Sequence, residues 1–420
     1  MSTNGKLAKP LAGGAPLAGG APPAGGAPPF RGMMPILPTA ITESGEVDEA
    51  SQRRLVQYCL KCGAVAIGHL GGASEFYKVG DGDRRRLIEI VVDEVAARAG
   101  RALRKCGAAA LRRRHGHGGP SGLAAAGRVP VFIGVTATTT RIAVNYAREA
   151  ERLGADMIMA ASPYMDVPDA AGMFDYYRAL SDAVSIPIIV QDTATSDAVL
   201  SPDFLWRLYD ELENVYYAKV EGRRFLTKIA AVLGVRRRRL RPPTPSSAGA
   251  ELRRPRRRKR NFVAREGGTR RSQGSAGTVP IERRAASNGD PHRGLSPRGL
   301  RVIGGAGGKH LIHMLRLGVT AFMTGTEALD IHAAVVSAYL AGDEDKAARI
   351  YYEQLLPYFM FYQDYNRELL KGMLHRRGVI DCPNVIPPAP GAPMSEVERR
   401  EFEWVLRRIG FDEKAWPDIP

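Results

Sequence analysis

Cysteine and tryptophan are scarce in this chain of 420 residues, which has four of the former and three of the latter. Four cysteines are too few to staple a chain of this length, so the sequence excludes a disulfide framework and favours a reducing compartment. We therefore expect the protein in the cytoplasm. Cys59 and Cys62 form a CxxC pair, but it lies within a helical pattern and no second pair follows. His310 and His313 are three apart on another predicted helix, with no carboxylate to complete a ligand set. We expect no metal site.

Long apolar runs are also absent. No window approaches the length that a membrane-spanning helix needs, so we expect no membrane partner. The N-terminus lacks a basic stretch followed by a leucine-rich core, and so does not have the pattern of a secretory signal.

Acidic residues are scarce in the basic parts of the chain. The net charge of +16 is at first sight typical of a nucleic-acid-binding protein. However, residues 234–300 alone have a net charge of +15, and residues 101–128 have seven basic residues and no acidic one. Outside these segments and the first 32 residues the net charge is −9. The basic charge therefore belongs to low-complexity segments, and we do not expect nucleic acid as a partner.

Apolar strand-like runs alternate with amphipathic helical runs from Met33 onward. The expected strands are residues 33–38, 64–70, 130–135, 156–161, 186–191, 215–219, 301–304 and 319–324. The expected helices are residues 48–61, 83–98, 139–153, 170–184, 202–212, 223–233, 308–317 and 327–341. Eight strands, each followed by a helix, predict an α/β fold of the (β/α)8 TIM-barrel type. Three further helical stretches form a C-terminal helical extension: residues 343–356, 358–376 and 395–408.

Three segments interrupt this rhythm. Residues 1–30 are a Gly/Ala/Pro-rich tail, and residues 101–127 and 235–299 are basic inserts with little apolar periodicity. We expect all three to be disordered. The inserts each follow a helix and precede a strand, which places them on the face of the barrel opposite the active site; an alternative is that they are translated non-coding sequence. The barrel then spans residues 31–342 and the extension residues 343–420.

Lys219 ends a predicted strand of β-branched and aromatic residues. A lysine at the C-terminal end of a barrel strand lies where barrel enzymes carry out their chemistry. Burial there can lower the pKa of the ammonium group, so that the neutral amine attacks a ketone and forms a Schiff base. The alternative is a lysine in water on an edge strand. His69 ends the second strand near the same mouth, and we interpret it as a structural histidine.

Two polar residues are expected to point the same way as Lys219. Side chains two apart on a strand share a face, so Glu221 should lie beside Lys219 and either hold its ammonium group or move a proton. The alternative is a simple salt bridge at the strand end. By the same alternation Gln191 points with Ile189, whereas Asp192 points to the other side. Gln191 is our candidate for polarising the substrate, with a hydrogen-bonded core amide as the alternative.

A glycine-rich cluster follows the seventh strand and begins with Gly304, Gly305 and Ala306. Amide groups at such a strand-to-helix turn can bind a phosphate or a carboxylate. The alternative is a tight turn that needs positive φ angles. No acidic partner for a ribose follows at a suitable distance, so the cluster is not a dinucleotide fingerprint.

The order and spacing of several motifs resemble those of the dihydrodipicolinate synthase / N-acetylneuraminate lyase family of Schiff-base barrel enzymes. The resemblance covers residues 33 to about 410, apart from the inserts. The matching stretches are Gly71-Gly72-Ala73-Ser74-Glu75, Gly154-Ala155-Asp156, Ser162-Pro163-Tyr164-Met165, Val190-Gln191-Asp192-Thr193, Lys219 at the position of the Schiff-base lysine, Gly342-Asp343 and Arg376-Arg377-Gly378-Val379-Ile380. The first of them is similar to the family's Gly-Thr-Thr-Gly-Glu loop.

The resemblance implies a class I lyase or aldolase, similar to 4-hydroxy-tetrahydrodipicolinate synthase. Its substrate would be pyruvate or another 2-keto acid, bound as a covalent imine to Lys219 without a further cofactor. Substrate contacts are implied at Gly72 and Ala73, and the resemblance supports the glycine-rich cluster as a carboxylate site. A homodimer or homotetramer is implied as well.

Several positions depart from the family pattern. The family's proton relay uses a threonine and two tyrosines, whereas this chain has Gly72 and Ala73, Met165 and Gln191 at the corresponding positions. Glutamine cannot act as a general acid or base. The arginine that binds a second carboxylate is replaced by Ser196. The chain is therefore expected to be a divergent member that keeps the lysine and has lost the relay. The alternatives are a catalytically silent barrel that acts as a sensor, and a weak polyanion binder through the basic insert.

Overall fold

The computed structural model describes residues 30–105, 128–193, 200–222, 224–235, 299–389 and 393–411. The Gly/Ala/Pro-rich tail and most of both predicted inserts lie outside the described residues, so their expected disorder stays a prediction. The same holds for Ser196.

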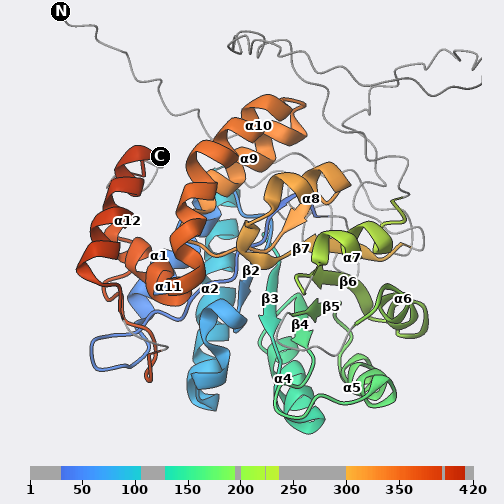
Figure 1. Ribbon diagram of the computed structural model, residues 1–420. Helices are drawn as coiled ribbons and strands as arrows, with labels where there is room; N and C mark the ends of the chain where they lie inside the picture. Colours follow the sequence, from blue (N-terminus) through green and yellow to red (C-terminus); the bar gives the residue numbers. More distant parts are fainter. Residues whose placement is uncertain are drawn as a thin grey trace, which may run out of the picture. The chain divides into compact units, whose positions relative to one another are not determined.

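Eight parallel strands form one sheet in the order β1-β8-β7-β6-β5-β4-β3-β2. The strands are β1 (Gly32–Met33), β2 (Ile67–His69), β3 (Val131–Gly134), β4 (Met157–Ala161), β5 (Ile188–Asp192), β6 (Val215–Val220), β7 (Arg301–Gly304) and β8 (Ala321–Phe322). Just after β1, Ile36 forms a parallel bridge to Gly68 of β2, which joins the two edges of the sheet (Figure 1). The predicted (β/α)8 barrel is confirmed.

Six strands are shorter than the sequence pattern predicted, and β1, β2 and β8 are each shorter by four residues. Pro35 and Pro38 interrupt the first predicted strand and have no N–H to donate, which limits a regular ladder there. Pairing nevertheless continues past the strand end, because the N–H of Gly68 donates to the carbonyl of Pro35 at 2.9 Å and the N–H of Ile36 to that of Thr324 at 3.0 Å. The barrel is thus closed by hydrogen bonds that extend beyond the short strands.

A helix follows each strand. The helices of the barrel are α1 (Glu49–Lys61), α2 (Asp81–Lys105), α4 (Thr140–Arg152), α5 (Ala170–Ala183), α6 (Pro202–Glu211), α7 (Phe225–Val232), α8 (Leu311–Leu317) and α9 (Leu329–Leu340). Four of them begin at a side-chain cap that accepts a backbone N–H three residues on: Asp48, Thr139, Asp169 and Ser201. α2 corrects the prediction: it runs beyond residue 98 and past the expected insert boundary at 101, because alanine, leucine, arginine and lysine all favour a helix.

Side chains alternate across each strand and form two apolar layers. The barrel interior is filled by Met34, Ile36, Ala66, Phe132, Met157, Met159, Ile189, Tyr217, Ile303, Ala321 and Met323. The outer layer, which includes Val190, Ala218 and Val220, packs with the helices. Because Ile189 points inward and Val190 outward, Gln191 points inward and Asp192 outward, as the alternation predicted. The C-terminal ends of β5 and β6 therefore bring polar side chains into the barrel.

Three helices follow the barrel at the predicted positions. α10 (Glu344–Ile350) continues through the π-helical turn η7 (Tyr351–Leu355) into α11 (Leu356–Arg376), and α12 (Glu396–Arg408) packs beside α11 (Figure 1). In α11 the side chain of Arg367 donates to the carbonyl of Gly72 after β2 at 3.2 Å. Earlier in α11, Tyr362 packs near Gly307 after β7. α11 therefore lies against the C-terminal mouth of the barrel. None of the helices in the described ranges is long and apolar enough to cross a membrane.

Candidate active site

Lys219, Glu221 and Gln191 meet inside the barrel at the C-terminal ends of β5 and β6. Lys219 is 5 % exposed, and its Nζ lies 3.0 Å from Oε1 of Glu221. Gln191, which is the register neighbour of Lys219 across the two strands, donates from Nε2 to the same Oε1 at 2.6 Å. The three side chains thus form a compact group, as the strand alternation predicted. Their catalytic roles remain predictions.

Glu221 has a third partner, which the sequence did not reveal. The backbone N–H of Ala306 donates to Oε2 of Glu221 at 2.9 Å, so both carboxylate oxygens are engaged. Burial alone would raise the pKa of Glu221, but the charge of Lys219 and the hydrogen bonds from Ala306 and Gln191 outweigh it and hold the pKa below its ordinary value. Glu221 is therefore ionised at neutral pH and can accept a proton.

The glycine-rich loop after β7 wraps around this carboxylate. A methyl group on Gly305 would lie 2.5 Å from Oε2 of Glu221, so only glycine fits there. Ala306 has a φ of 56°, a left-handed conformation that costs a non-glycine residue about 1–2 kcal/mol. Gly304 faces outward, because a methyl group there would lie 2.7 Å from Met314 and from Phe322. The lack of a side chain at Gly304 thus serves packing, and its predicted contact with substrate is untested.

Gly72 and Ala73 lie in the short 3₁₀ turn η1 (Gly72–Ser74) after β2. A methyl group on Gly72 would meet no atom within 4 Å, whereas Ala73 packs on the apolar layers. Glu75, directly after this turn, anchors it to α11. Its Oε1 lies 3.1 Å from Nζ of Lys78, and its Oε2 lies 3.1 Å from Nζ of Lys371 in α11. Gly72 therefore borders open space on a firmly held turn, as a substrate contact would require.

A second lysine–carboxylate pair lies on the outer side of β5. Asp192 points away from the interior, and its Oδ2 lies 2.7 Å from Nζ of Lys228 on α7. Burial raises the pKa of Asp192, while the hydrogen bond and charge of Lys228 oppose that shift. This pair is separated from Lys219 by the barrel wall, so Lys228 is not a second candidate for imine formation.

His69 is structural, as we interpreted it. The residue is fully buried, it points to the outer layer, and its Nδ1 accepts the N–H of Leu70 at 2.7 Å. Burial, together with the charge of Arg84, lowers the pKa of His69 to about 3. The ring is therefore neutral at physiological pH. In the part of the chain that the structure describes, no group of three His, Cys, Asp or Glu side chains could hold a metal ion.

The contribution of α11 and α9 to the mouth was not predicted. Tyr362 lies near the glycine-rich loop, and burial, the carboxylate of Glu327 and, more weakly, that of Glu221 raise its pKa. His332 of α9 contacts the carbonyl of Gly307 in the same loop. These contacts join residues far apart in the chain. Neither a motif nor a periodicity marks them.

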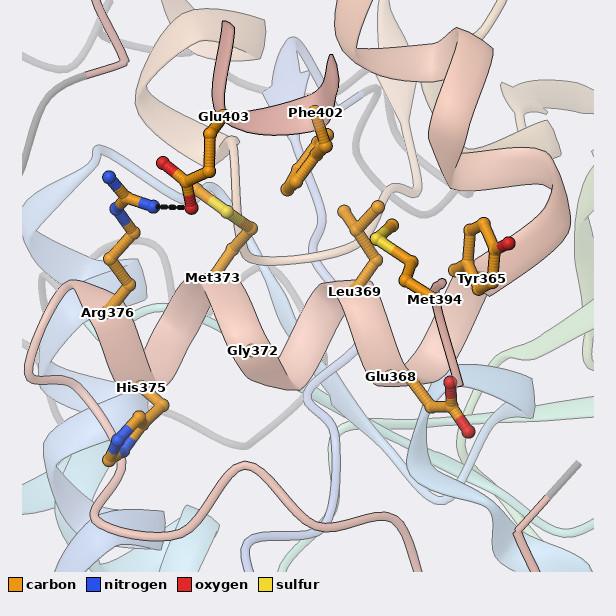
Figure 2. Close-up of a pocket in the computed structure, with 10 residues that line it drawn as sticks. All are labelled: Tyr365, Glu368, Leu369, Gly372, Met373, His375, Arg376, Met394, Phe402 and Glu403. Atoms are coloured by element: carbon orange, nitrogen blue, oxygen red, sulfur yellow. Dashed lines mark hydrogen bonds and ion pairs between the residues drawn. The ribbon is translucent and has the colours of Figure 1, made fainter. Parts of the chain in front are cut away.

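A cavity of about 680 Å³ lies elsewhere, between α11 and α12 (Figure 2). Its lining is Tyr365, Glu368, Leu369, Gly372, Met373, His375, Arg376, Met394, Phe402 and Glu403. An ion pair between Arg376 and Glu403, 2.5 Å long, borders it. None of the predicted site residues lines this cavity, and its lining includes no lysine. We therefore place the candidate site at Lys219.

The closed barrel and the lysine–glutamate pair at its C-terminal mouth define a TIM-barrel protein with its polar site at the carboxyl ends of the strands. The sequence model of the dihydrodipicolinate synthetase family matches residues 29–112 and 122–234. Over these residues the chain is similar to that family.

Relatives and solved structures agree with this similarity. The L-2-keto-3-deoxyarabonate dehydratase of Azospirillum brasilense is 32% identical over 193 residues, which are 45% of this chain and 52% of that protein. A 4-hydroxy-tetrahydrodipicolinate synthase of Nitrobacter hamburgensis is 29% identical over 174 residues, 41% of this chain and 48% of that protein. The chain thus spans about half the length of these relatives. Dihydrodipicolinate synthase from Thermotoga maritima shares the fold, with a TM-score of 0.64, 18% identity, and coverage of 91% of this chain and 99% of that chain.

Proposed function

We propose that this protein is a class I lyase that binds a 2-keto acid as an imine on Lys219. The observation that carries the proposal is the buried ion pair of 3.0 Å between Lys219 and Glu221 inside the barrel mouth. An ammonium group here has one base within reach, so proton transfer to Glu221 frees the amine for attack. Similarity to the dihydrodipicolinate synthetase family supports the same chemistry.

The proton transfers of imine formation balance between Lys219 and Glu221. The freed amine of Lys219 attacks the keto carbon, and the carbinolamine then loses water with the proton that Glu221 returns. Three hydrogens of the ammonium group end as one on the iminium nitrogen and two in water, so the charge is unchanged. Gln191 cannot move protons, but its amide fixes Oε1 of Glu221 at 2.6 Å. Gln191 is thus a positioning residue for Glu221.

The next step is removal of a proton from the carbon adjacent to the iminium. The iminium accepts the electron pair, an enamine forms, and Glu221 is the base. The enamine can then expel a hydroxyl group from the following carbon or add to an aldehyde. Ser196, which replaces a carboxylate-binding arginine of the family pattern, removes support for a second carboxylate. We therefore favour dehydration of a 3-deoxy-2-keto sugar acid, in line with the name of the Azospirillum relative.

The subunit arrangement is also part of the proposal. Tyr164 and Met165 follow β4, are 42 % and 73 % exposed, and stand where the family resemblance implies contact with a neighbouring subunit. We therefore propose a homodimer or homotetramer. Sedimentation of the full chain at several concentrations tests it, and a monomer at all concentrations would exclude it.

Borohydride trapping tests the imine. Incubation with pyruvate or a 3-deoxy-2-keto sugar acid and borohydride should add the mass of the reduced adduct to the wild-type chain. Lys219→Ala should remain unlabelled. Lys228→Ala is the matched control, because it removes the other ion-paired lysine of the region from the far side of the wall. Labelling of Lys219→Ala, or no labelling of the wild type by any keto acid, would refute the proposal and favour the sensor.

A further inference from the structure

His332 of α9 is fully buried beneath the glycine-rich loop that follows β7. Its Nε2 lies 3.1 Å from the carbonyl oxygen of Gly307, and its Nδ1 lies 2.7 Å from that of Ala328 in its own helix. A methyl group on Gly308 would lie 2.5 Å from Nε2, so the loop rests directly on the imidazole edge. The ring is thus in contact with the loop and not with substrate space.

Only one of the two ring nitrogens of His332 can donate when the ring is neutral. Burial lowers the pKa of His332, which keeps it neutral near physiological pH, and a neutral imidazole has one N–H. Both neighbours are carbonyl groups and can only accept. The carbonyl of Ala328 already accepts the backbone N–H of His332 at 3.0 Å. A carbonyl oxygen can accept two hydrogen bonds, so each tautomer has a partner: a proton on Nδ1 binds the carbonyl of Ala328, and a proton on Nε2 binds that of Gly307. We assign the proton to Nε2, where it supports the loop.

The hydrogen bond to Gly307 acts next to the point where the loop touches the carboxylate. Ala306 precedes Gly307, is held in a left-handed conformation, and donates its N–H to Glu221 at 2.9 Å. A loop in this strained conformation needs support on both sides to keep its N–H aimed at Glu221. Glu221 supplies one side, and His332 supplies the other.

We propose that His332 is a positioning residue that fixes the Gly305–Gly308 loop, so that its amides face Glu221 and the carboxylate of the bound 2-keto acid. The inference rests on the proposed function for the identity of the ligand. It goes beyond that function because it assigns a role to α9, which carries no residue of the imine chemistry.

The role of His332 can be measured through the pKa of the Glu221 carboxyl group. The groups that act on that carboxyl are Lys219 of β6, Gln191 of β5, the N–H of Ala306 after β7 and, more weakly, Tyr362 of α11 and Asp192. Loss of the Ala306 hydrogen bond removes one of the contributions that lower the pKa of Glu221. The pKa of Glu221 should then rise, a change that a loss of general packing would not single out.

Two amide substitutions separate the two hydrogen bonds of His332. The amide nitrogen of glutamine lies about as far from the backbone as Nε2, so His332→Gln can still donate to Gly307. The amide nitrogen of asparagine lies about where Nδ1 does, so His332→Asn can donate to Ala328 but not to the loop. Both variants bury one uncharged amide, which makes them matched controls for each other.

The experiment measures the keto-acid concentration that half-saturates borohydride trapping, and the pKa of the Glu221 carboxyl by carbon NMR without substrate. His332→Gln should stay close to wild type in both. His332→Asn should raise the half-saturating concentration about tenfold, which corresponds to about 1.4 kcal/mol or one hydrogen bond, and should raise the pKa of Glu221.

Equal behaviour of the two variants, whether both normal or both impaired, would overturn the role of the Gly307 hydrogen bond. An unchanged Glu221 pKa in a folded His332→Asn variant would do the same. The NMR titration needs no imine, so it decides the inference even if trapping of the wild type fails. A failure of trapping alone counts against the proposed function instead.

Discussion

Replacement of Glu221 by glutamine should separate imine formation from the proton transfer that follows it. The substitution keeps the shape of the side chain, and its amide oxygen can still accept the N–H of Ala306. The amide is not a base. The iminium of pyruvate should then form more slowly, because the base that frees the Lys219 amine is gone. The iminium that does form should fail to exchange its methyl protons with solvent deuterium, because exchange requires removal of a proton to give the enamine.

The magnitude follows from the role of a positioned base. Such a group contributes typically about 10²–10⁴-fold, or about 3–5 kcal/mol of activation free energy, so the exchange rate should fall by that factor. The fold should weaken as well. A buried ammonium group left without its partner destabilises a protein by about 3–5 kcal/mol, and Lys219 and Glu221 are both largely buried, with side chains 6 % and 16 % exposed.

Proton NMR of pyruvate in deuterated buffer measures the exchange, and no second substrate is needed. Asp192→Asn is the matched control, since it removes a carboxylate of the same region from the outer side of the wall, where it pairs with Lys228. That variant should exchange within a few-fold of wild type. Exchange by Glu221→Gln at the wild-type rate, in protein that still traps pyruvate, would refute Glu221 as the base.

Three further predictions concern the loop, the pH dependence and the inserts. Gly305→Ala should displace the Glu221 carboxylate and reduce deuterium exchange by at least about tenfold while the protein stays folded; normal exchange would contradict the contact. The pKa of Glu221 is lowered in the folded state, so ionised Glu221 stabilises the fold above the unfolded pKa, and this stabilisation is lost as pH falls through the folded pKa. The free energies of urea unfolding of wild type and Glu221→Gln should therefore converge in acid. A difference that widens in acid would contradict this. Replacement of residues 106–127 and 236–298 by short Gly-Ser links should keep trapping and the melting temperature and reduce heparin binding; a loss of trapping would show that the inserts belong to the fold.

Strand alternation was enough to predict which polar residues enter the barrel. It placed Lys219, Glu221 and Gln191 on one face and Asp192 on the other, because a side-chain period of two is a property of the local backbone. The same periodicities located the strands and helices. The end of α2 was missed because the helix continues into a segment that we took for insert, whose residues favour a helix.

The supports of the site could not be predicted, because they are tertiary. The N–H of Ala306 carries no sequence signal, and its contact with Glu221 spans 85 positions. Arg367 reaches Gly72 across 295 positions. His332 reads as one of three polar residues in a mostly apolar helix, with Asp330 and Ser337, and only the packing of α9 under the loop places it against Gly307. Local patterns therefore predicted the side chains that point into the barrel mouth, but not those that hold them in place.

The outer pair of Asp192 and Lys228 has a consequence for strand register. A slip of β5 by one residue would exchange its two faces and bring Asp192 into the interior beside Glu221, while Gln191 would face Lys228. The slipped sheet would then hold two carboxylates together inside and a buried lysine without a counter-charge outside. Both effects disfavour the register slip. The ion pair of Asp192 and Lys228 on the outer face therefore favours the alignment of β5 against β6 that is observed, with Gln191 beside Lys219 and Glu221 inside the barrel.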